Sequence, residues 1–184
     1  MEKKNVRLIE PNDMYLLSYL AACQGFKRHH VNLYSLHDPD DFDMWRHTIF
    51  DDFRNQSQGI GLPEGYVPAT TFWMVQGDEW IGVGNIRHRL TDQLERFGGH
   101  IGYAIHCDAW GMGYATMLLH LLLEQAAMLG ITSALLTCDA ENIASERVMQ
   151  KNGGKYLDTI DTLIDGINHH TRRYRIETPP HRPK

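Results

Sequence analysis

The sequence has few of the features that mark secreted or membrane-spanning proteins. It contains 3 cysteines among 184 residues, at positions 23, 107 and 138, and no C-x-x-C pair. Its first residues, MEKKNVRLIEPND, are charged and lack the apolar run of a signal peptide. The longest apolar run, MLLHLLL, is interrupted by His120 and is too short to span a bilayer. We therefore expect a cytoplasmic protein with reduced, buried thiols and no membrane partner.

Positive charge and metal-binding motifs are also scarce. Lys and Arg number 18 against 23 Asp and Glu, a net charge of -5, which argues against a nucleic-acid partner. The 11 histidines show no H-E-x-x-H and no zinc-type Cys/His spacing, so no metal is expected. One acidic run could attract a cationic amine, although a solvated helix face is the simpler explanation. It consists of Asp38, Asp40, Asp41, Asp43, Asp51 and Asp52.

The composition is that of an ordinary globular protein, with 42% hydrophobic and 22% charged residues. The chain is long enough to fill one core, and no repeat or low-complexity linker divides it. We predict one domain over residues 1–176 and a disordered tail at 177–184.

Hydrophobic periodicity predicts an α/β protein with a mixed sheet and one strand–helix–strand crossover. Strands are expected at 6–10, 71–76, 80–90, 100–107, 133–138, 155–160 and 169–177. Helices are expected at 14–26, 38–59, 115–130 and 142–152. In the second helix, an apolar face at spacings of three and four is formed by Phe42, Trp45, Ile49 and Phe53.

Two glycines, Gly111 and Gly113, stand where the strand at 100–107 leads into the long helix. A helix N-terminus offers unpaired N–H groups and a positive dipole end, so phosphate binding is one interpretation. A tight turn with unusual backbone angles is the other. A dinucleotide-binding oxidoreductase would need G-x-G-x-x-G directly after the strand, but Thr116 replaces the third glycine and residues 108–110 intervene. A P-loop is excluded because no Gly-Lys-Ser/Thr follows.

Two longer segments, IGYAIHCDAWGMGYATMLL and LLTCDAENIASERVMQKNGG, closely resemble GNAT-type N-acetyltransferases, which use acetyl-CoA. The family's phosphate loop, Arg/Gln-x-x-Gly-x-Gly/Ala, falls on residues 110–115, its Asn-x-x-Ser on 142–145 and its Lys-x-Gly on 151–153. The resemblance extends over about residues 60–176 and is to a subgroup of predicted bacterial acetyltransferases. It implies a GNAT-like splayed sheet flanked by helices, and direct transfer of an acetyl group from acetyl-CoA to a primary amine.

The resemblance also implies which residues hold acetyl-CoA. The backbone of Tyr103, Ala104 and Ile105 would bind the pantetheine arm, and the N–H of Tyr103 would polarise the thioester carbonyl. The helix that opens with Asn142 and Ser145 would meet the CoA arm from the other side. The pyrophosphate would be wrapped by a loop made of Trp110, Gly111, Met112, Gly113, Tyr114 and Ala115.

Two positions depart from the family pattern. Trp110 stands where the loop usually begins with Arg or Gln, which reduces the cationic help for the phosphates. Met149 stands where many members have a Tyr that protonates the departing thiolate. Either another group or water supplies that proton, or the protein is a CoA-binding or sensing module without full catalysis.

The base and the acceptor are less well defined by the sequence. His100, at the start of the strand that would carry the thioester, is our candidate catalytic base, and His88 is the next. A strand-end histidine bonded to a neighbour is the structural alternative for His100. Cys107 and Cys138 fit core thiols better than nucleophiles. The segment GLPEGYVPAT should border the acceptor, a small-molecule or peptide amine, and a homodimer is compatible with the sequence.

Overall fold

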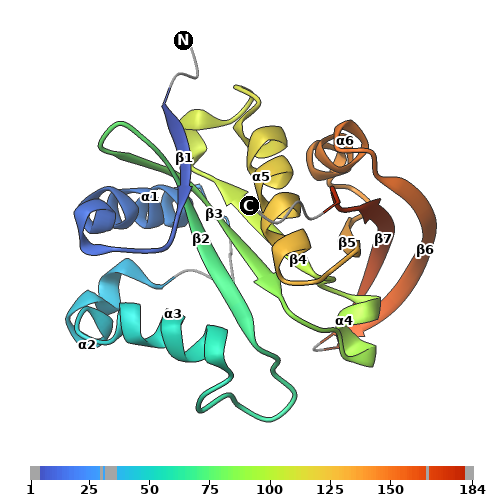
Figure 1. Cartoon of the computed structure of the whole chain (residues 1–184), viewed down its shortest axis with the longest axis horizontal. Coiled ribbons are helices and arrows are strands. Elements are labelled where there is room, and N and C mark those ends of the chain that lie inside the picture. The colour runs from blue at the N-terminus through green and yellow to red at the C-terminus, as the bar shows by residue number, and fades with distance from the viewer. Residues whose placement is uncertain (1–4, 30, 32–36, 165, 181–184) are drawn as a thin grey trace.

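The computed structural model describes residues 5–29, 31, 37–164 and 166–180. These residues form two β-sheets that lie next to each other, with helices packed on their faces (Figure 1). Helices and strands are interspersed along the described chain rather than gathered in separate halves, in agreement with the predicted α/β class.

The first sheet is antiparallel, with strand order β1-β2-β3-β4. Its central strands β2 and β3 form an antiparallel hairpin, with the turn at Gly77 and Asp78. Both are almost entirely buried because helices cover the two faces of the sheet. The strand bounds are β1 Val6–Ile9, β2 Ala69–Gln76, β3 Glu79–Arg87 and β4 Ile101–Ile105.

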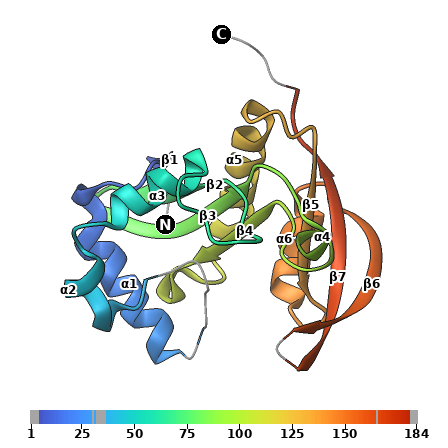
Figure 2. The same ribbon diagram turned by 90° about the horizontal axis from the view of Figure 1, so that it is seen from below.

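The second sheet is also antiparallel, with strand order β5-β7-β6. Its central strand is the last in the chain, and its Tyr174 and Ile176 are buried in the core. Figure 2 shows this sheet as a curved wall beside the first one. The strand bounds are β5 Ser133–Asp139, β6 Lys155–Ile164 and β7 Ile167–Glu177.

The helices divide between the faces of the first sheet and the second sheet (Figures 1 and 2). On one side of the first sheet lie α1 Leu16–Arg28, α2 Phe42–Trp45 and α3 Ile49–Gln58, while α5 Tyr114–Met128 covers the other side. Helix α6 Ile143–Lys151 packs beside α5 and β5, and α4 Asp92–Arg96 lies between β3 and β4 in the chain. The described residues also form three short 3-10 turns: η1 Asp13–Tyr15, η2 Pro39–Asp41 and η3 Cys107–Ala109.

The prediction of one continuous helix over residues 38–59 is wrong. A turn at 46–48 separates α2 from α3, because both the N–H and the hydroxyl of Thr48 donate to the Trp45 carbonyl, at 2.9 and 3.2 Å. Trp45 and Ile49, on either side of this turn, are both buried, so the predicted apolar face still packs on the first sheet.

Two cores hold the layers together. The larger one lies between α5 and the sheets, where Leu118, Leu119 and Leu122 are fully buried, while His120 and Glu124 on the opposite side of the helix are exposed. The smaller one lies between the first sheet and α1–α3 and is rich in aromatic rings. It includes Tyr19, Trp45, Trp73 and Trp80, and the Tyr19 and Trp73 rings stack with centroids 4.7 Å apart.

The predicted fold class, a single-domain α/β protein with a splayed sheet flanked by helices, is confirmed. Within the described residues, each of the two halves is antiparallel by itself. The domain boundary at 176 stays a prediction. In the predicted tail, Thr178 is bonded to Thr132 and Ile131, whereas positions 181–184 lie outside the described residues.

Candidate active site

The two sheets are joined at one end of β4 and β5 and separate along the rest of these strands. At the joint, the N–H of His100 donates to the Leu135 carbonyl at 2.7 Å, and the N–H of Leu135 donates to Nδ1 of His100 at 3.0 Å. No strand ladder connects β4 to β5 in the part of the chain that the structure describes. Beyond this joint, the edge of β4 that faces away from β3 has no strand partner among the described residues, and we call this unpaired edge and the divergence of the two sheets beside it the cleft.

The backbone groups on this edge belong to alternate residues of β4. The bond from Arg87 N–H to His100 C=O shows which residues pair with β3, because bonding pairs alternate in an antiparallel ladder. By this alternation Ala104 directs its N–H and C=O toward β3, whereas Tyr103 and Ile105 direct theirs into the cleft. Of the three residues predicted to bind pantetheine, Tyr103 and Ile105 have the backbone orientation that such binding needs.

The cleft leads into the loop that carries Gly111 and Gly113. Both glycines have left-handed backbone angles, with φ of +74° and +78°, which other residues rarely adopt. Gly113 is the N-cap of α5, a helix of 15 residues. Within the described residues, the N–H groups of Ala115 and Thr116 donate no hydrogen bond, as in any first helical turn. The loop thus offers free donors and the positive end of a long helix dipole.

Aromatic side chains fix this loop in place. The indole Nε1–H of Trp110 donates to the Ile105 carbonyl at 2.7 Å, so it occupies one acceptor on the β4 edge. The side chain is 50% exposed, and its ring lies 5.9 Å from that of His29 at the end of α1. Tyr114 is buried, and its hydroxyl donates to Oε1 of Gln76 in β2 at 2.5 Å. The neighbouring Met112 is half exposed.

Helix α6 borders the cleft on the β5 side. Asn142 caps this helix, because its Oδ1 accepts the N–H of Ser145 at 3.0 Å. The Ser145 hydroxyl lies 2.9 Å from that of Tyr103, so two hydroxyl groups connect β4 to α6. Burial raises the pKa of Tyr103 to about 12, and its phenol therefore keeps its proton at neutral pH. The structure brings these three predicted residues together, with the Asn142 oxygen committed to the cap.

Met149 and the cysteines face the core. Met149 is fully buried in the cluster formed by α5 and the second sheet, and its thioether cannot donate a proton. Cys23, Cys107 and Cys138 are buried free thiols, as predicted. Burial raises the pKa of Cys138 to about 11 and also raises the pKa of Cys107. Since the thiolate is the nucleophile, these protonated thiols agree with a packing role.

The two candidate bases have different surroundings. His88 follows β3, and its Nε2 lies 2.8 Å from the Thr70 hydroxyl; burial lowers its pKa. His100 accepts the Leu135 N–H at Nδ1, so the neutral ring carries its proton on Nε2. Burial, and then the charge of Arg175, lower the pKa of His100. Catalysis by either histidine stays a prediction.

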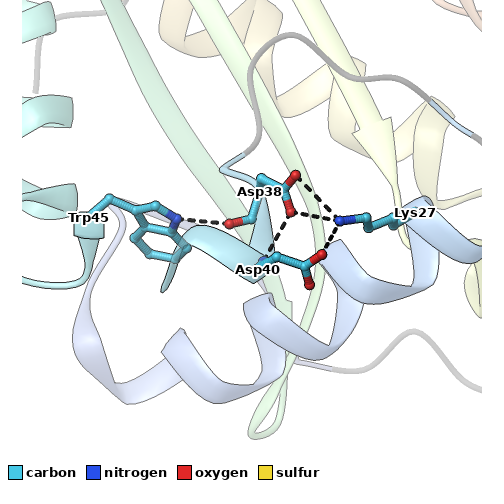
Figure 3. A network of polar contacts seen from close by, with 4 residues as sticks. All are labelled: Lys27, Asp38, Asp40 and Trp45. Carbon is cyan, nitrogen blue, oxygen red and sulfur yellow. Dashed lines mark hydrogen bonds and ion pairs between the residues drawn. The ribbon is translucent and has the colours of Figure 1, made fainter. Parts of the chain in front are cut away.

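Most of the acidic run is paired with cations of the chain itself. Figure 3 shows Lys27 of α1 held between the carboxylates of Asp38 and Asp40, while the indole of Trp45 donates to the Asp38 carbonyl at 2.9 Å. The other pairs are Asp43 with Arg46, at 3.1 Å, and Asp51 with Arg54, at 2.6 Å. These pairs are exposed and favour a solvated helix face over a surface that attracts amines.

The described residues contain neither a cluster that could bind a metal ion nor a helix that could span a membrane. No group of three or more His, Cys, Asp or Glu side chains there could hold a metal ion. No helix in the same part of the chain is both long and apolar enough to cross a membrane.

Sequence reasoning missed two contacts in the cleft. The bond between His100 and Leu135 joins residues 35 positions apart, and the hydroxyl pair of Tyr103 and Ser145 joins residues 42 positions apart. No spacing rule within one helix or strand relates residues so distant, so the sequence carries no local signal of either contact.

A split sheet with a strand edge that leads into a glycine loop and a helix N-terminus defines a protein of the GNAT fold. The model of the acetyltransferase (GNAT) domain family matches residues 6–155, so the chain belongs to this family. Among curated proteins, none shows a significant match to the chain.

Solved acetyltransferase structures share the fold at low sequence identity. An acetyltransferase from Salmonella typhimurium that modifies the N-terminal serine of ribosomal protein L7/L12 is 17% identical, with a TM-score of 0.67 over 95% of each chain. The microcin C7 self-immunity acetyltransferase, in complex with acetyl-CoA and AMP, is 13% identical, with a TM-score of 0.66 over 95% of this chain and 93% of that one. A spermidine N-acetyltransferase chimera from Vibrio cholerae is 12% identical, with a TM-score of 0.60 over 95% and 96% of the two chains.

Proposed function

We propose that this protein transfers the acetyl group of acetyl-CoA to a primary amine. The observation that carries the proposal is the succession of elements along the chain: the free edge of β4 is followed directly by the glycine loop and by the N-terminus of α5. A thioester arm and a diphosphate, joined as they are in CoA, need these two surfaces in this order.

The residues present fit the two chemical parts of CoA. The cleft-facing N–H and C=O groups of Tyr103 and the N–H of Ile105 can bond to the amides of a pantetheine arm, as an added strand would, while the Ile105 carbonyl already accepts the Trp110 indole. The N–H groups of Ala115 and Thr116, together with the left-handed Gly113, can hold the diphosphate. When bound, acetyl-CoA would supply the activated acetyl group, and CoA would leave as a thiolate when the bond between the acetyl carbon and sulfur breaks.

The amine must lose a proton as it attacks, and the thiolate must gain one. The cleft-facing N–H of Tyr103 is placed to stabilise negative charge on the thioester oxygen. The side chains of Tyr103 and Ser145 form a pair of hydroxyl groups beside α6. In this proposal the pair protonates the thiolate, because Met149 has no proton to donate. Because Tyr103 stays protonated at neutral pH, this pair can deliver a proton to the thiolate.

The acceptor is proposed only as a class. The fold neighbours act on a protein N-terminal serine and on spermidine, and both of these carry primary amines. In this chain, Glu64 and Tyr66 lie exposed in the loop before β2, on the segment predicted to border the acceptor.

A panel of amines tests the proposal with the full-length protein. Acetyl-CoA would be mixed with peptides that have a free N-terminus, with spermidine and with small amines, and thiol release would be followed. Release that requires both protein and amine is expected, and N-terminally blocked peptides serve as matched controls. Absence of acetyl-CoA binding would contradict the proposal, whereas tight binding without turnover on any amine would favour the binding-module alternative.

A further inference from the structure

At the joint between the two sheets, one of the hydrogen bonds is made by a side chain, that of His100. A pair of neighbouring strands normally exchanges N–H···O=C bonds, but here the Leu135 N–H is accepted by the imidazole Nδ1 of His100 at 3.0 Å. The return bond, from His100 N–H to the Leu135 carbonyl at 2.7 Å, is an ordinary backbone bond. The ring of His100 therefore replaces a backbone carbonyl at the point where the sheets begin to separate.

The chain around His100 is built for this close approach. Gly99 has φ of +61°, and a Cβ atom on it would lie 2.4 Å from the Leu135 carbonyl oxygen, so only glycine fits. The carbonyls of Gly98 and Gly99 accept bonds from Arg87, at 3.2 and 3.0 Å. The Gly98 N–H donates to the Thr137 hydroxyl at 2.9 Å. These contacts hold the start of β4 against β5 from both sides of the joint.

We propose that His100 is a positioning residue rather than the proton acceptor. Its neutral ring, bonded to Leu135, sets the distance between β4 and β5 and so holds the β4 edge in the geometry that binds CoA. This inference rests on the proposed function for its CoA readout. It also predicts a property of the free protein that does not depend on CoA.

The chemistry of imidazole makes this joint sensitive to acid. Only the neutral ring has a lone pair at Nδ1; the protonated ring carries a hydrogen there, which opposes the Leu135 N–H. The charged groups that face the ring are Arg175 of β7, Arg87 of β3 and Glu95 of α4. The two arginines oppose a positive ring, and Glu95 favours it. Burial and the charge of Arg175 outweigh the two influences that raise the pKa, the Leu135 backbone and the Glu95 carboxylate, so the pKa of His100 lies below its usual value of about 6.5.

The lowered pKa of His100 determines how the free energy of unfolding changes with pH. A histidine with a lowered folded-state pKa contributes its full stability above the unfolded value of about 6.5. That contribution is lost as the pH falls through the lower folded-state pKa. The joint should therefore be intact at neutral pH and open in acid.

Three substitutions at one position separate positioning from catalysis. In His100→Asn, the amide oxygen can take the place of Nδ1, and it does not titrate. In His100→Gln, the amide lies one carbon further out and cannot reach the Leu135 N–H in the same geometry. His100→Ala removes the acceptor, and His120→Asn, on the exposed face of α5, controls for the loss of a histidine charge. CoA affinity would be measured by calorimetry near pH 7.5 and near pH 5.5, together with thermal unfolding and turnover.

We expect His100→Asn to bind CoA within about threefold of wild type near neutral pH, and the Gln and Ala variants to bind at least about tenfold more weakly. Wild type should lose CoA affinity and thermal stability in acid more steeply than the Asn variant. Equal CoA affinity in wild type and the Asn, Gln and Ala variants of His100 would overturn the inference. If turnover fell by the same factor in all three variants, His100 would instead be assigned as the catalytic base.

The thermal measurement keeps the inference separate from the proposed function. If wild type does not bind CoA, the proposed function fails, and the joint is then judged from stability alone. Parallel acid melting curves for wild type and His100→Asn would refute the joint in that case. If the Gln and Ala variants do not fold, the same comparison of wild type with Asn decides the question.

Discussion

Gly113 is the residue at which a single substitution tests phosphate binding most directly. Its φ of +78° strains any side chain, so a lone substitution would mix strain with charge. Asn and Asp side chains have the same shape, so Gly113→Asn and Gly113→Asp form a matched pair of variants. Asn is also among the residues other than glycine that most often adopt left-handed backbone angles. We expect Gly113→Asp to bind CoA at least about tenfold more weakly than Gly113→Asn, because a carboxylate would face the phosphate, and the gap should narrow at high salt. Equal affinities by calorimetry would mean that the loop is only a turn.

The hydroxyl pair in the cleft gives a second prediction at the residue scale. Tyr103→Phe keeps the ring packed but removes the proton that is shared with Ser145. We expect a drop in kcat of about 10²-fold, the lower range for loss of general acid catalysis, with CoA affinity within a few-fold of wild type. Steady-state kinetics and calorimetry would separate these effects. Ser145→Ala is the companion variant, and unchanged kcat in both variants would assign thiolate protonation to water.

At the scale of elements, the approach of β4 to β5 depends on the absence of a side chain at Gly99. Gly99→Ala would place a methyl group 2.4 Å from the Leu135 carbonyl oxygen and would strain a φ of +61°. We expect the free energy of unfolding to fall by about 1–3 kcal/mol, measured from urea denaturation midpoints.

Gly102→Ala in the same strand is the control for this change, since a Cβ there meets no atom within 4 Å. Its unfolding midpoint should stay close to that of wild type. Similar losses of stability in both variants would show that the chain tolerates an added methyl group at neither position. The loss at Gly99 would then not be due to its contact with Leu135.

At the scale of the whole molecule, ligand binding should couple the two sheets. A ligand that bonds to β4, α5 and α6 together stabilises only the folded state, so CoA at a hundredfold its dissociation constant should add about 2.7 kcal/mol to the free energy of unfolding. For a chain of this size the melting temperature should rise by several degrees in differential scanning fluorimetry. NADH at the same concentration should cause no shift. A shift with NADH and none with CoA would favour the dinucleotide-binding interpretation.

Local features of the fold and of the site follow from short sequence patterns. Periods of 3.6 and 2 residues located the long helix and the strands. The glycine loop was readable because Gly111 and Gly113 stand two positions apart at a helix start, and the family resemblance marked Asn142 and Ser145, which lie three apart at the start of α6. Each of these depends on interactions among neighbours in the chain, which short patterns encode.

How these local features contact one another depends on the three-dimensional packing of the chain. The break between α2 and α3 depends on a turn at Thr48 that the continuous apolar spacing concealed. The side of β4 that faces the cleft depends on its pairing with β3. The partner of His100 is Leu135, and the partner of Tyr103 is Ser145, because two sheets and a helix pack together across 35 and 42 residues of chain. The role of a polar side chain depends on the group with which it forms a hydrogen bond. Which group lies within hydrogen-bond distance depends on the packing of the folded chain as a whole.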